Sequence, residues 1–337
     1  MLNHRQFAAA TVSFAIGVAL LTGATSAGAN VRAGYGFKDP AIIAIHDGDS
    51  FVVNGGLSTI TEFSNQTGAL VRIMSGRPYG LVHPFDIAFS GQDAFVLNED
   101  TVSEISATTG DRVRVIGGLG YDFDLPFAIV VAGGDAFVTN EAGDSVTEFS
   151  TTTGALVRVI DAKALSFNDS NYIAISGTSA FVTNSTGRSV TEFSTKTGAL
   201  VRVIGGQTYN FNGPFAIVIV RGDALVTNVL GETVTEFSTK TGAFVRVIGN
   251  GAISVGYVAT WHGDAFIVTG NAVSEVSAKT GVLVRTIAGN GYHFDGANDI
   301  AISNGDAFVT NASGNSVTEF SSATGKLVRV LSNRSAS

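Results

Sequence analysis

Six residues combine reactive or polar side chains with an irregular distribution along an otherwise repetitive chain. Two carboxylates and two phenols occupy a recurring position that other copies of the repeat fill with alanine or isoleucine, and two amides stand directly before one of each. Such groups bind polar ligands, and carboxylates coordinate divalent cations such as calcium. The alternative is that they line a water-filled channel. The six predicted ligand-binding residues are Asp86, Asp299, Asn171, Asn298, Tyr172 and Tyr257.

A second irregular group consists of His46, Arg221, Trp261 and His262. Imidazole rings beside a guanidinium group bind anions or transfer protons, so the four residues form a second candidate cluster. Three different copies of the repeat must bring them together, which makes this prediction depend on the fold. No cofactor is expected; if a divalent cation such as calcium is present, its predicted ligands are the two aspartates of the first group.

An internal repeat organises the chain around these residues. The third copy, from Pro126 to Ile160, reads PFAIVVAGGDAFVTNEAGDSVTEFSTTTGALVRVI. It divides into four strand segments at Phe127–Val131, Ala136–Asn140, Ser145–Ser150 and Leu156–Ile160, separated by turn residues. A glycine turn recurs about every 44 residues, which is the period of a four-stranded propeller blade. The seven turn glycines are Gly68, Gly110, Gly154, Gly198, Gly242, Gly281 and Gly325.

The first and last copies are as regular as the middle ones, which favours a closed ring over an open solenoid with polar caps. The segments AFVTN and VTEFS..TG.LVRVI resemble the YVTN family of β-propeller repeats and, more loosely, the NHL repeats. Both the repeat and the resemblance predict an all-β, seven-bladed β-propeller at 30–337. The predicted blades are 40–76, 84–119, 126–163, 170–206, 214–250, 255–290 and 297–332. We expect the ring to close by packing between blades, helped by 31–34.

Residues that recur in every blade are assigned to the fold. Glu148 and Arg158 stand opposite each other across the Thr-Gly turn and have counterparts in all seven copies. We predict surface ion pairs on the outer strands, each contributing less than about 1 kcal/mol. The asparagine that ends the second strand, such as Asn140, is expected to close an Asx-type turn. The recurring Tyr-x-Phe of the connections between blades, such as Tyr121 and Phe123, is expected to be packing.

The N-terminus predicts export. Met1–Gln6 is polar, 7–21 is mostly apolar but short for a membrane span, and Ala27-Gly28-Ala29 suits signal cleavage. We therefore expect a signal peptide at 1–29 and a mature chain without a membrane span. The predicted location is secreted, extracellular or in the cell envelope, which means the periplasm in a cell with two membranes. The chain has no cysteine, which excludes disulfides, thiolate metal sites and a catalytic thiol.

The formal net charge is −8, and no basic cluster is present, so we expect no nucleic-acid partner. In a propeller, the connections between blades and those between the second and third strands share one face. That face collects most of the net negative charge, including Asp122, Asp124 and Asp295. Such a field attracts cationic partners.

No hydrolase, zinc-protease, P-loop or dinucleotide motif appears. The sequence therefore favours a non-enzymatic, monomeric binding scaffold that presents loops on its acidic face to a protein, peptide or glycan. One alternative is a propeller enzyme, a lyase or lactonase-like hydrolase, with a metal or acid–base site at the central channel. The other is a structural protein of the cell envelope. Fold alone decides none of these.

Overall fold

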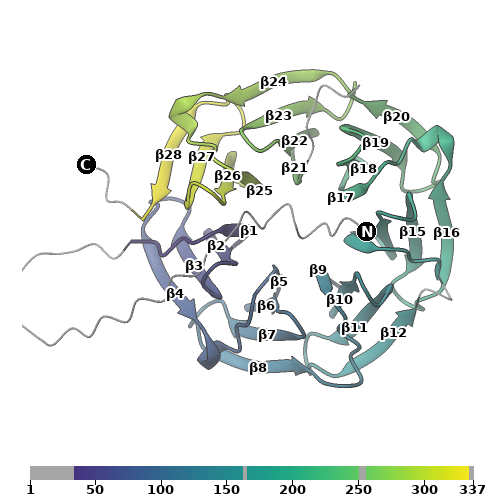
Figure 1. The fold of residues 1–337 in the computed structure, drawn as a ribbon, viewed down its shortest axis with the longest axis horizontal. Coiled ribbons are helices and arrows are strands. Elements are labelled where there is room, and N and C mark those ends of the chain that lie inside the picture. The colour runs from purple at the N-terminus through teal and green to yellow at the C-terminus, as the bar shows by residue number, and fades with distance from the viewer. Residues whose placement is uncertain (1–33, 162–164, 250–255, 334–337) are drawn as a thin grey trace, which may run out of the picture.

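The computed structural model describes residues 34–161, 165–249 and 256–333. These residues form seven four-stranded antiparallel sheets, and the strands of each sheet pair in the order of the sequence. Figure 1 shows the sheets arranged as blades around a central axis. The predicted seven-bladed β-propeller is therefore confirmed. The predicted signal peptide at 1–29 lies outside the described residues.

The blades have nearly equal strands. The first three contain β1 (Pro40–His46), β2 (Asp49–Asn54), β3 (Thr59–Ser64) and β4 (Leu70–Ser75); β5 (Asp86–Ser90), β6 (Asp93–Leu97), β7 (Thr101–Ser106) and β8 (Arg112–Gly117); and β9 (Pro126–Ala132), β10 (Asp135–Asn140), β11 (Ser145–Ser150) and β12 (Leu156–Asp161). Blades four and five contain β13 (Ser170–Ser176), β14 (Ser179–Asn184), β15 (Ser189–Ser194) and β16 (Leu200–Gly205), then β17 (Pro214–Val220), β18 (Asp223–Asn228), β19 (Thr233–Ser238) and β20 (Phe244–Ile248). Blades six and seven contain β21 (Val258–Trp261), β22 (Asp264–Val268), β23 (Ala272–Ser277) and β24 (Leu283–Ala288), then β25 (Ala297–Ser303), β26 (Asp306–Asn311), β27 (Ser316–Ser321) and β28 (Leu327–Ser332). Among the described residues, three short 3₁₀ helices lie between blades: η2 (Arg77–Tyr79), η3 (Gln207–Tyr209) and η4 (Asn290–Tyr292). No helix of the described residues is long and apolar enough to cross a membrane.

Each blade places its first strand near the axis and its fourth strand on the rim (Figure 1). The second strand is buried on both faces because neighbouring blades cover it, as β10 shows from Ala136 to Asn140. Phenylalanines carry the contact between blades: the rings of Phe137 in blade three and Phe193 in blade four lie 6.3 Å apart. Burying such a ring stabilises the fold by about 1.5–3 kcal/mol.

The Thr-Gly turn sets the register of the outer hairpin. Gly154 has φ 73°, a left-handed conformation that glycine adopts without strain. Its amide donates to the carbonyl of Ser150 at 2.8 Å. The turn thereby places Glu148 directly opposite Arg158, as the sequence predicted.

The prediction that these ion pairs lie on the surface is wrong. The side chain of Glu148 is 1% exposed and that of Arg158 is 28% exposed, and Nε of the arginine lies 2.5 Å from Oε2 of the glutamate. The Nη2 atom of Arg158 also donates to the carbonyls of Thr195 and Lys196, at 3.0 and 3.3 Å. Both acceptors belong to the Thr-Gly turn of the next blade, which covers the glutamate. The repeated pair is therefore a clamp between blades, and we call it the Glu–Arg clamp.

Ring closure uses the same contacts. Phe308 of blade seven packs against Phe63 of blade one with ring centroids 6.1 Å apart, and Arg329 donates to the carbonyl of Asn65 at 2.5 Å. In addition, Oδ1 of Asn333 accepts from the amide of Phe37 at 2.8 Å. Within the described residues, each of the seven sheets is built from consecutive strands, so the ring closes there without strand exchange, as expected. Of the predicted helper segment 31–34, 31–33 lies outside the described residues.

The other repeated polar residues also hold neighbouring elements together. Nδ2 of Asn140 donates to the hydroxyls of Ser145 and Thr147 on the next strand, each at 3.0 Å, so a cross-strand network replaces the expected Asx-type turn. The hydroxyl of Tyr121 donates to the carbonyl of Gly154 in the following turn at 2.6 Å. This contact supports the predicted packing role of the Tyr-x-Phe motif.

Candidate functional site

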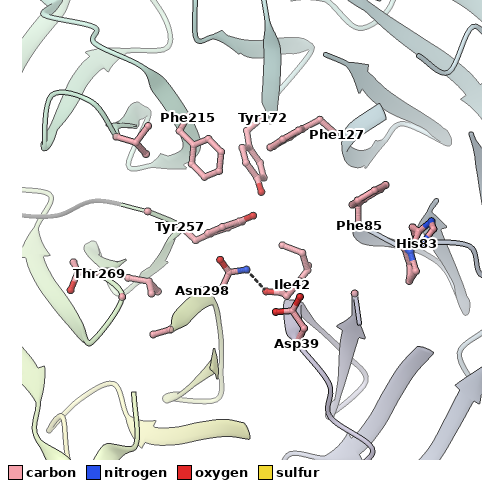
Figure 2. A pocket seen from close by; sticks show the side chains of 18 of the residues that line it. Asp39, Ile42, His83, Phe85, Phe127, Tyr172, Phe215, Tyr257, Thr269 and Asn298 are labelled. Atoms are coloured by element: carbon pink, nitrogen blue, oxygen red, sulfur yellow. Dashed lines mark hydrogen bonds between the residues drawn. The ribbon is translucent and has the colours of Figure 1, made fainter. Parts of the chain in front are cut away.

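A cavity of about 770 Å³ occupies the centre of the face that carries the connections between blades. We call it the funnel. Its walls come from the starts of the first strands and from the loops before β1 and β5 and after β6, β18 and β22. Figure 2 shows aromatic side chains from different blades pointing into it. The funnel is therefore a volume of the described structure to which several blades present side chains.

A proline followed by phenylalanine builds much of this wall. Pro126 is the first residue of β9 and pairs with Asn140, and the pairing is irregular at that point. Proline is tolerated at the first residue of a strand, and a bulge there re-aims the next side chain. Phe127 consequently points into the funnel. The same arrangement at Pro214 directs Phe215 toward the axis.

Four aromatic rings of the funnel form one contiguous cluster and pack edge to face. The centroid of Tyr172 lies 5.2 Å from that of Phe127, 4.9 Å from that of Phe215 and 5.4 Å from that of Tyr257. The tyrosine hydroxyls point toward each other (Figure 2). Burial raises the pKa of both phenols, so both hydroxyls stay neutral and can donate a proton in a hydrogen bond. Phe85 adds a fifth ring from blade two.

The remaining ionisable side chains of the funnel lie around its mouth. Three are carboxylates: Asp39, Glu99 and Glu232. Burial raises the pKa of Asp39, and the nearby charge of Lys38 acts in the opposite direction. His83 is the fourth, and its Nδ1 lies 3.1 Å from Oε2 of Glu99, with both side chains exposed. The mouth of the funnel is therefore predominantly acidic.

Directly below the funnel is a smaller cavity of about 190 Å³, which we call the chamber. Tyr172 and Tyr257 line both volumes, and Asp86 and Asp299 line the chamber. The sequence prediction that these four positions face the axis is supported by this placement. Whether they bind a ligand remains a prediction.

The two aspartates of the chamber accept hydrogen bonds from backbone amides. Oδ2 of Asp86 accepts from the amide of Ile129 in the next blade at 2.9 Å, and Oδ1 accepts from Ile87 at 2.8 Å. Oδ2 of Asp299 accepts from the amide of Ile43 at 2.9 Å. Burial raises the pKa of each carboxyl to about 7 in spite of these hydrogen bonds. The aspartates thus join neighbouring first strands and can change charge near neutral pH.

The two predicted asparagines lie in different surroundings. Asn298 lines the funnel, and its Nδ2 donates to the carbonyl of Ala41 across the junction of blades seven and one at 2.9 Å (Figure 2). Asn171 is fully buried and lines neither cavity. The pairing of β13 is irregular between Ser170 and Ile173, and this turns Tyr172 rather than Asn171 to the axis.

The second predicted cluster divides into two parts. The ring of His46 stacks on Phe89 of blade two with centroids 4.5 Å apart, and its Nε2 lies 3.4 Å from Oδ2 of Asp47. Trp261 stacks on His262 at 4.1 Å.

Arg221 of blade five belongs with the second part. A side chain added at Gly263, beside His262, would meet its Nη1 at 2.9 Å. The nearest neighbour of a side chain added at Gly305 in blade seven would be the ring of Trp261, at 3.7 Å. No contact of the described residues joins this group to His46, because blade seven separates blades six and one (Figure 1).

The acidic residues singled out in the connections between blades are exposed. Asp122, Asp124 and Asp295 lie outside the funnel lining. Among the residues that the structure describes, no group of three or more histidine, aspartate or glutamate side chains is placed to hold a metal ion. A metal bound at Asp86 and Asp299 would have just these two carboxylates, and each already accepts backbone amides.

Sequence reasoning missed the phenylalanines of the funnel and His83. A signal for the phenylalanines was present, since a Pro-Phe pair stands at the start of the first strand or directly before it at Phe85, Phe127 and Phe215 and in no other blade. His83 precedes the first of these pairs.

Comparison with known proteins adds evidence on the fold. No protein-family model matches the chain, and no curated protein matches its sequence. A catalytically inactive histidine-to-alanine variant of virginiamycin B lyase from Staphylococcus aureus, solved with quinupristin, is similar with a TM-score of 0.71 at 12% identity, over 86% of this chain and 95% of that chain. Hydrazine synthase from Kuenenia stuttgartiensis gives 0.72 at 16% identity, over 88% and 99%. A functionally unknown protein from Desulfotomaculum acetoxidans gives 0.69 at 16%, over 85% and 95%. At these identities the likeness concerns the fold alone, and the resemblance to YVTN and NHL repeats stays a prediction.

Proposed function

We propose that this protein is an exported, non-enzymatic binding module and that the funnel is its ligand site. The observation that carries the proposal is the convergence of five aromatic side chains, from blades two to six, on one cavity of about 770 Å³. Binding sites for small molecules are of this size and are lined mainly by apolar side chains with a few polar groups. A protein, peptide or glycan partner would insert a side chain or a sugar ring into the same volume.

The chemistry of the walls favours binding over covalent catalysis. Thr269 carries the single aliphatic hydroxyl of the described lining, and its Oγ1 donates to the carbonyl of Ala272 at 2.9 Å. Covalent catalysis requires a general base that activates the nucleophile, and the described structure pairs this hydroxyl with a backbone carbonyl instead. Export rests on the composition of 1–29.

A thermal-shift screen tests the proposal. Small molecules, peptides and oligosaccharides are screened for compounds that raise the melting temperature, because ligands that bind the native state stabilise it. The effect of a true ligand should disappear in Phe127→Ala/Phe215→Ala and persist in Trp261→Ala, which alters the opposite face. A ligand whose stabilising effect is lost in the tryptophan variant and kept in the phenylalanine variant would overturn the assignment.

An acid–base enzyme is the second candidate. His83 and Glu99 form an imidazole–carboxylate pair at 3.1 Å on the funnel wall, an arrangement that can transfer protons. A similar fold occurs in virginiamycin B lyase, whose histidine-to-alanine variant is inactive. Incubation with quinupristin, followed by mass spectrometry, tests this candidate directly. Turnover that is lost in His83→Ala would support it, and an unchanged substrate would remove this substrate class.

A further inference from the structure

The permanently charged side chains that line the funnel are all acidic. Of the described residues that line the funnel and the chamber, none is lysine or arginine. The carboxylates of Asp39, Glu99 and Glu232 lie at the mouth of the funnel. His83 is paired with the second of these, Glu99. A cavity lined by charges of one sign with low-dielectric walls concentrates the opposite charge.

A second source of negative charge lies below the aromatic floor. Asp86 and Asp299 act electrostatically on the hydroxyls of Tyr172 and Tyr257, which separate the chamber from the funnel. A ligand seated on the tyrosines therefore lies between carboxylates above and carboxylates below. At a pH above about 7, where the chamber carboxyls are ionised, this arrangement disfavours an anion at every depth of the funnel.

The aromatic side chains add an attraction for the same sign of charge. The faces of phenylalanine and tyrosine rings carry negative partial charge and attract cations within about 6 Å, by about 0.5–2 kcal/mol for each contact. Phe85 and Phe127 stand on the same side of the funnel in Figure 2, and Tyr257 lies opposite them. A cation between these walls would meet rings from several blades.

The geometry points to a small organic cation with an apolar, ring-containing body as the ligand of the funnel. The volume of about 770 Å³ exceeds that of one lysine or arginine side chain and suits a drug-sized molecule. The apolar body would pack on the rings, and the cationic group would lie between the carboxylates at the mouth of the funnel and the tyrosine hydroxyls. This inference rests on the proposed function, because it assigns the chemical class of ligand for the same cavity.

Tetraphenylphosphonium and tetraphenylborate provide the test, because they have nearly the same shape and opposite charge. Calorimetric titration of the mature chain should show the cation binding at least tenfold more tightly than the anion. Raising the salt concentration should weaken the binding of the cation, since exposed charges are screened. The cation should still bind more tightly than the anion.

Variants then locate the effect. Glu99→Gln/Glu232→Gln should weaken the cation about tenfold and strengthen the anion. Asp122→Asn/Asp124→Asn is the matched control, because it removes the same charge from the same face outside the funnel. It should change the affinity of the cation less than twofold. Phe127→Leu, which keeps an apolar side chain and removes an aromatic face, should weaken the cation alone.

The outcomes separate this inference from the proposed function. Equal binding of both ions, with loss of both in Phe127→Ala/Phe215→Ala, would overturn the cation assignment and keep the funnel as a ligand site. Binding of arginine- or lysine-containing peptides with no binding of the phosphonium would also overturn it, in favour of a peptide ligand. Failure of both ions in the titration, together with no funnel-dependent ligand in the thermal-shift screen, would remove both proposals.

Discussion

The outer rim of this propeller holds carboxylates that are fully buried, its axis holds carboxylates that are partly buried, and the two regions stabilise them in different ways. On the rim, Glu148 is 1% exposed and is paired with Arg158, whose guanidinium also reaches the next blade. At the axis, Asp86 and Asp299 accept backbone amides, and no arginine or lysine lines their chamber. The rim arrangement recurs in all seven blades, whereas the axial aspartates occur in two.

This difference separates the requirements of folding from those of binding. A contact that every blade needs is repeated in every blade, and its charge is neutralised where it is buried. A carboxylate retained in two blades without a cationic partner is costly to keep ionised. Such positions are therefore candidates for function, as the convergence of the irregular residues on the funnel and the chamber indicates.

The largest expected effect comes from breaking one Glu–Arg clamp. Glu148→Ala should lower the free energy of unfolding by about 2–3 kcal/mol, because it removes one partner of a buried ion pair. The partial exposure of Arg158 keeps the loss below that of a fully buried pair. Urea denaturation measures the change.

Two controls test whether the loss belongs to the clamp. Glu99→Ala removes a carboxylate whose ion pair is exposed on both sides, so it should cost less than about 0.5 kcal/mol. The double variant Glu148→Ala/Arg158→Ala should be less destabilised than the sum of its single variants. A loss below about 1 kcal/mol for Glu148→Ala would restore the original view of a surface pair.

The axial aspartates should make stability depend on pH. The native pKa of Asp86 and of Asp299 is raised to about 7, whereas an unfolded aspartate titrates near 3.8. Between these values the native state binds more protons than the unfolded state, so stability should fall as the pH rises from about 4 to about 7 and then level off. Both side chains keep some exposure, so we expect a fall of about 2 kcal/mol.

The matching variant removes the titration without removing the side chains. Asp86→Asn/Asp299→Asn keeps one carbonyl acceptor at each position and should flatten the pH dependence of the melting temperature between pH 5 and 8. Asp122→Asn/Asp124→Asn, at exposed positions, should leave the dependence unchanged. Raised pKa values at Glu62, to about 7, and at other clamp glutamates act in the same direction, so a residual slope is expected. A wild-type stability that rises between pH 5 and 7 would contradict the assignment.

A smaller effect is expected where blades are joined by a neutral hydrogen bond. Tyr121→Phe removes the hydroxyl that donates to the carbonyl of Gly154 at 2.6 Å and keeps the ring. The expected cost is about 1 kcal/mol, since a net hydrogen bond in a folded protein contributes this much. Tyr172→Phe alters a hydroxyl at the axis and should cost less. Equal costs would mean that the two regions are not distinguished by their structural contacts.

Much of the fold could be predicted from the sequence because the information is repeated seven times. The Thr-Gly turn fixes the pairing of Glu148 with Arg158, and the structure confirms that register. The burial of the glutamate could not be read from one repeat, because the turn of the next blade covers it. Sequence within a blade specifies strands and turns, whereas burial on the rim depends on how neighbouring blades meet.

The candidate site was predicted in part for the same reason. Tyr172 and Asp299 reach the axis because the first strand of every blade lies beside it. Asn171 turns away because of an irregular pairing that the sequence does not signal. His46 and Trp261 each end a first strand, at the same face of the propeller, but their separation around the ring depends on which blades carry them.

The smallest expected effect concerns divalent cations at the axis, which the sequence made a natural hypothesis. Both oxygens of Asp86 already accept backbone amides, and the described residues provide two carboxylates there and no third. Calcium requires six to eight oxygen ligands, so the chamber would have to supply most of them from water. We therefore expect calcium, magnesium or EDTA to shift the melting temperature by less than about 1 °C, since a cation that does not bind the native state cannot stabilise it. The informative control is Asp86→Asn/Asp299→Asn measured at pH 8, where the wild-type carboxylates are ionised. Stabilisation by calcium in the wild type but not in this variant would show that a metal replaces the amide hydrogen bonds of the aspartates. The outer rim and the axis would then differ only in how they neutralise their carboxylates, by arginine at the rim and by a metal at the axis.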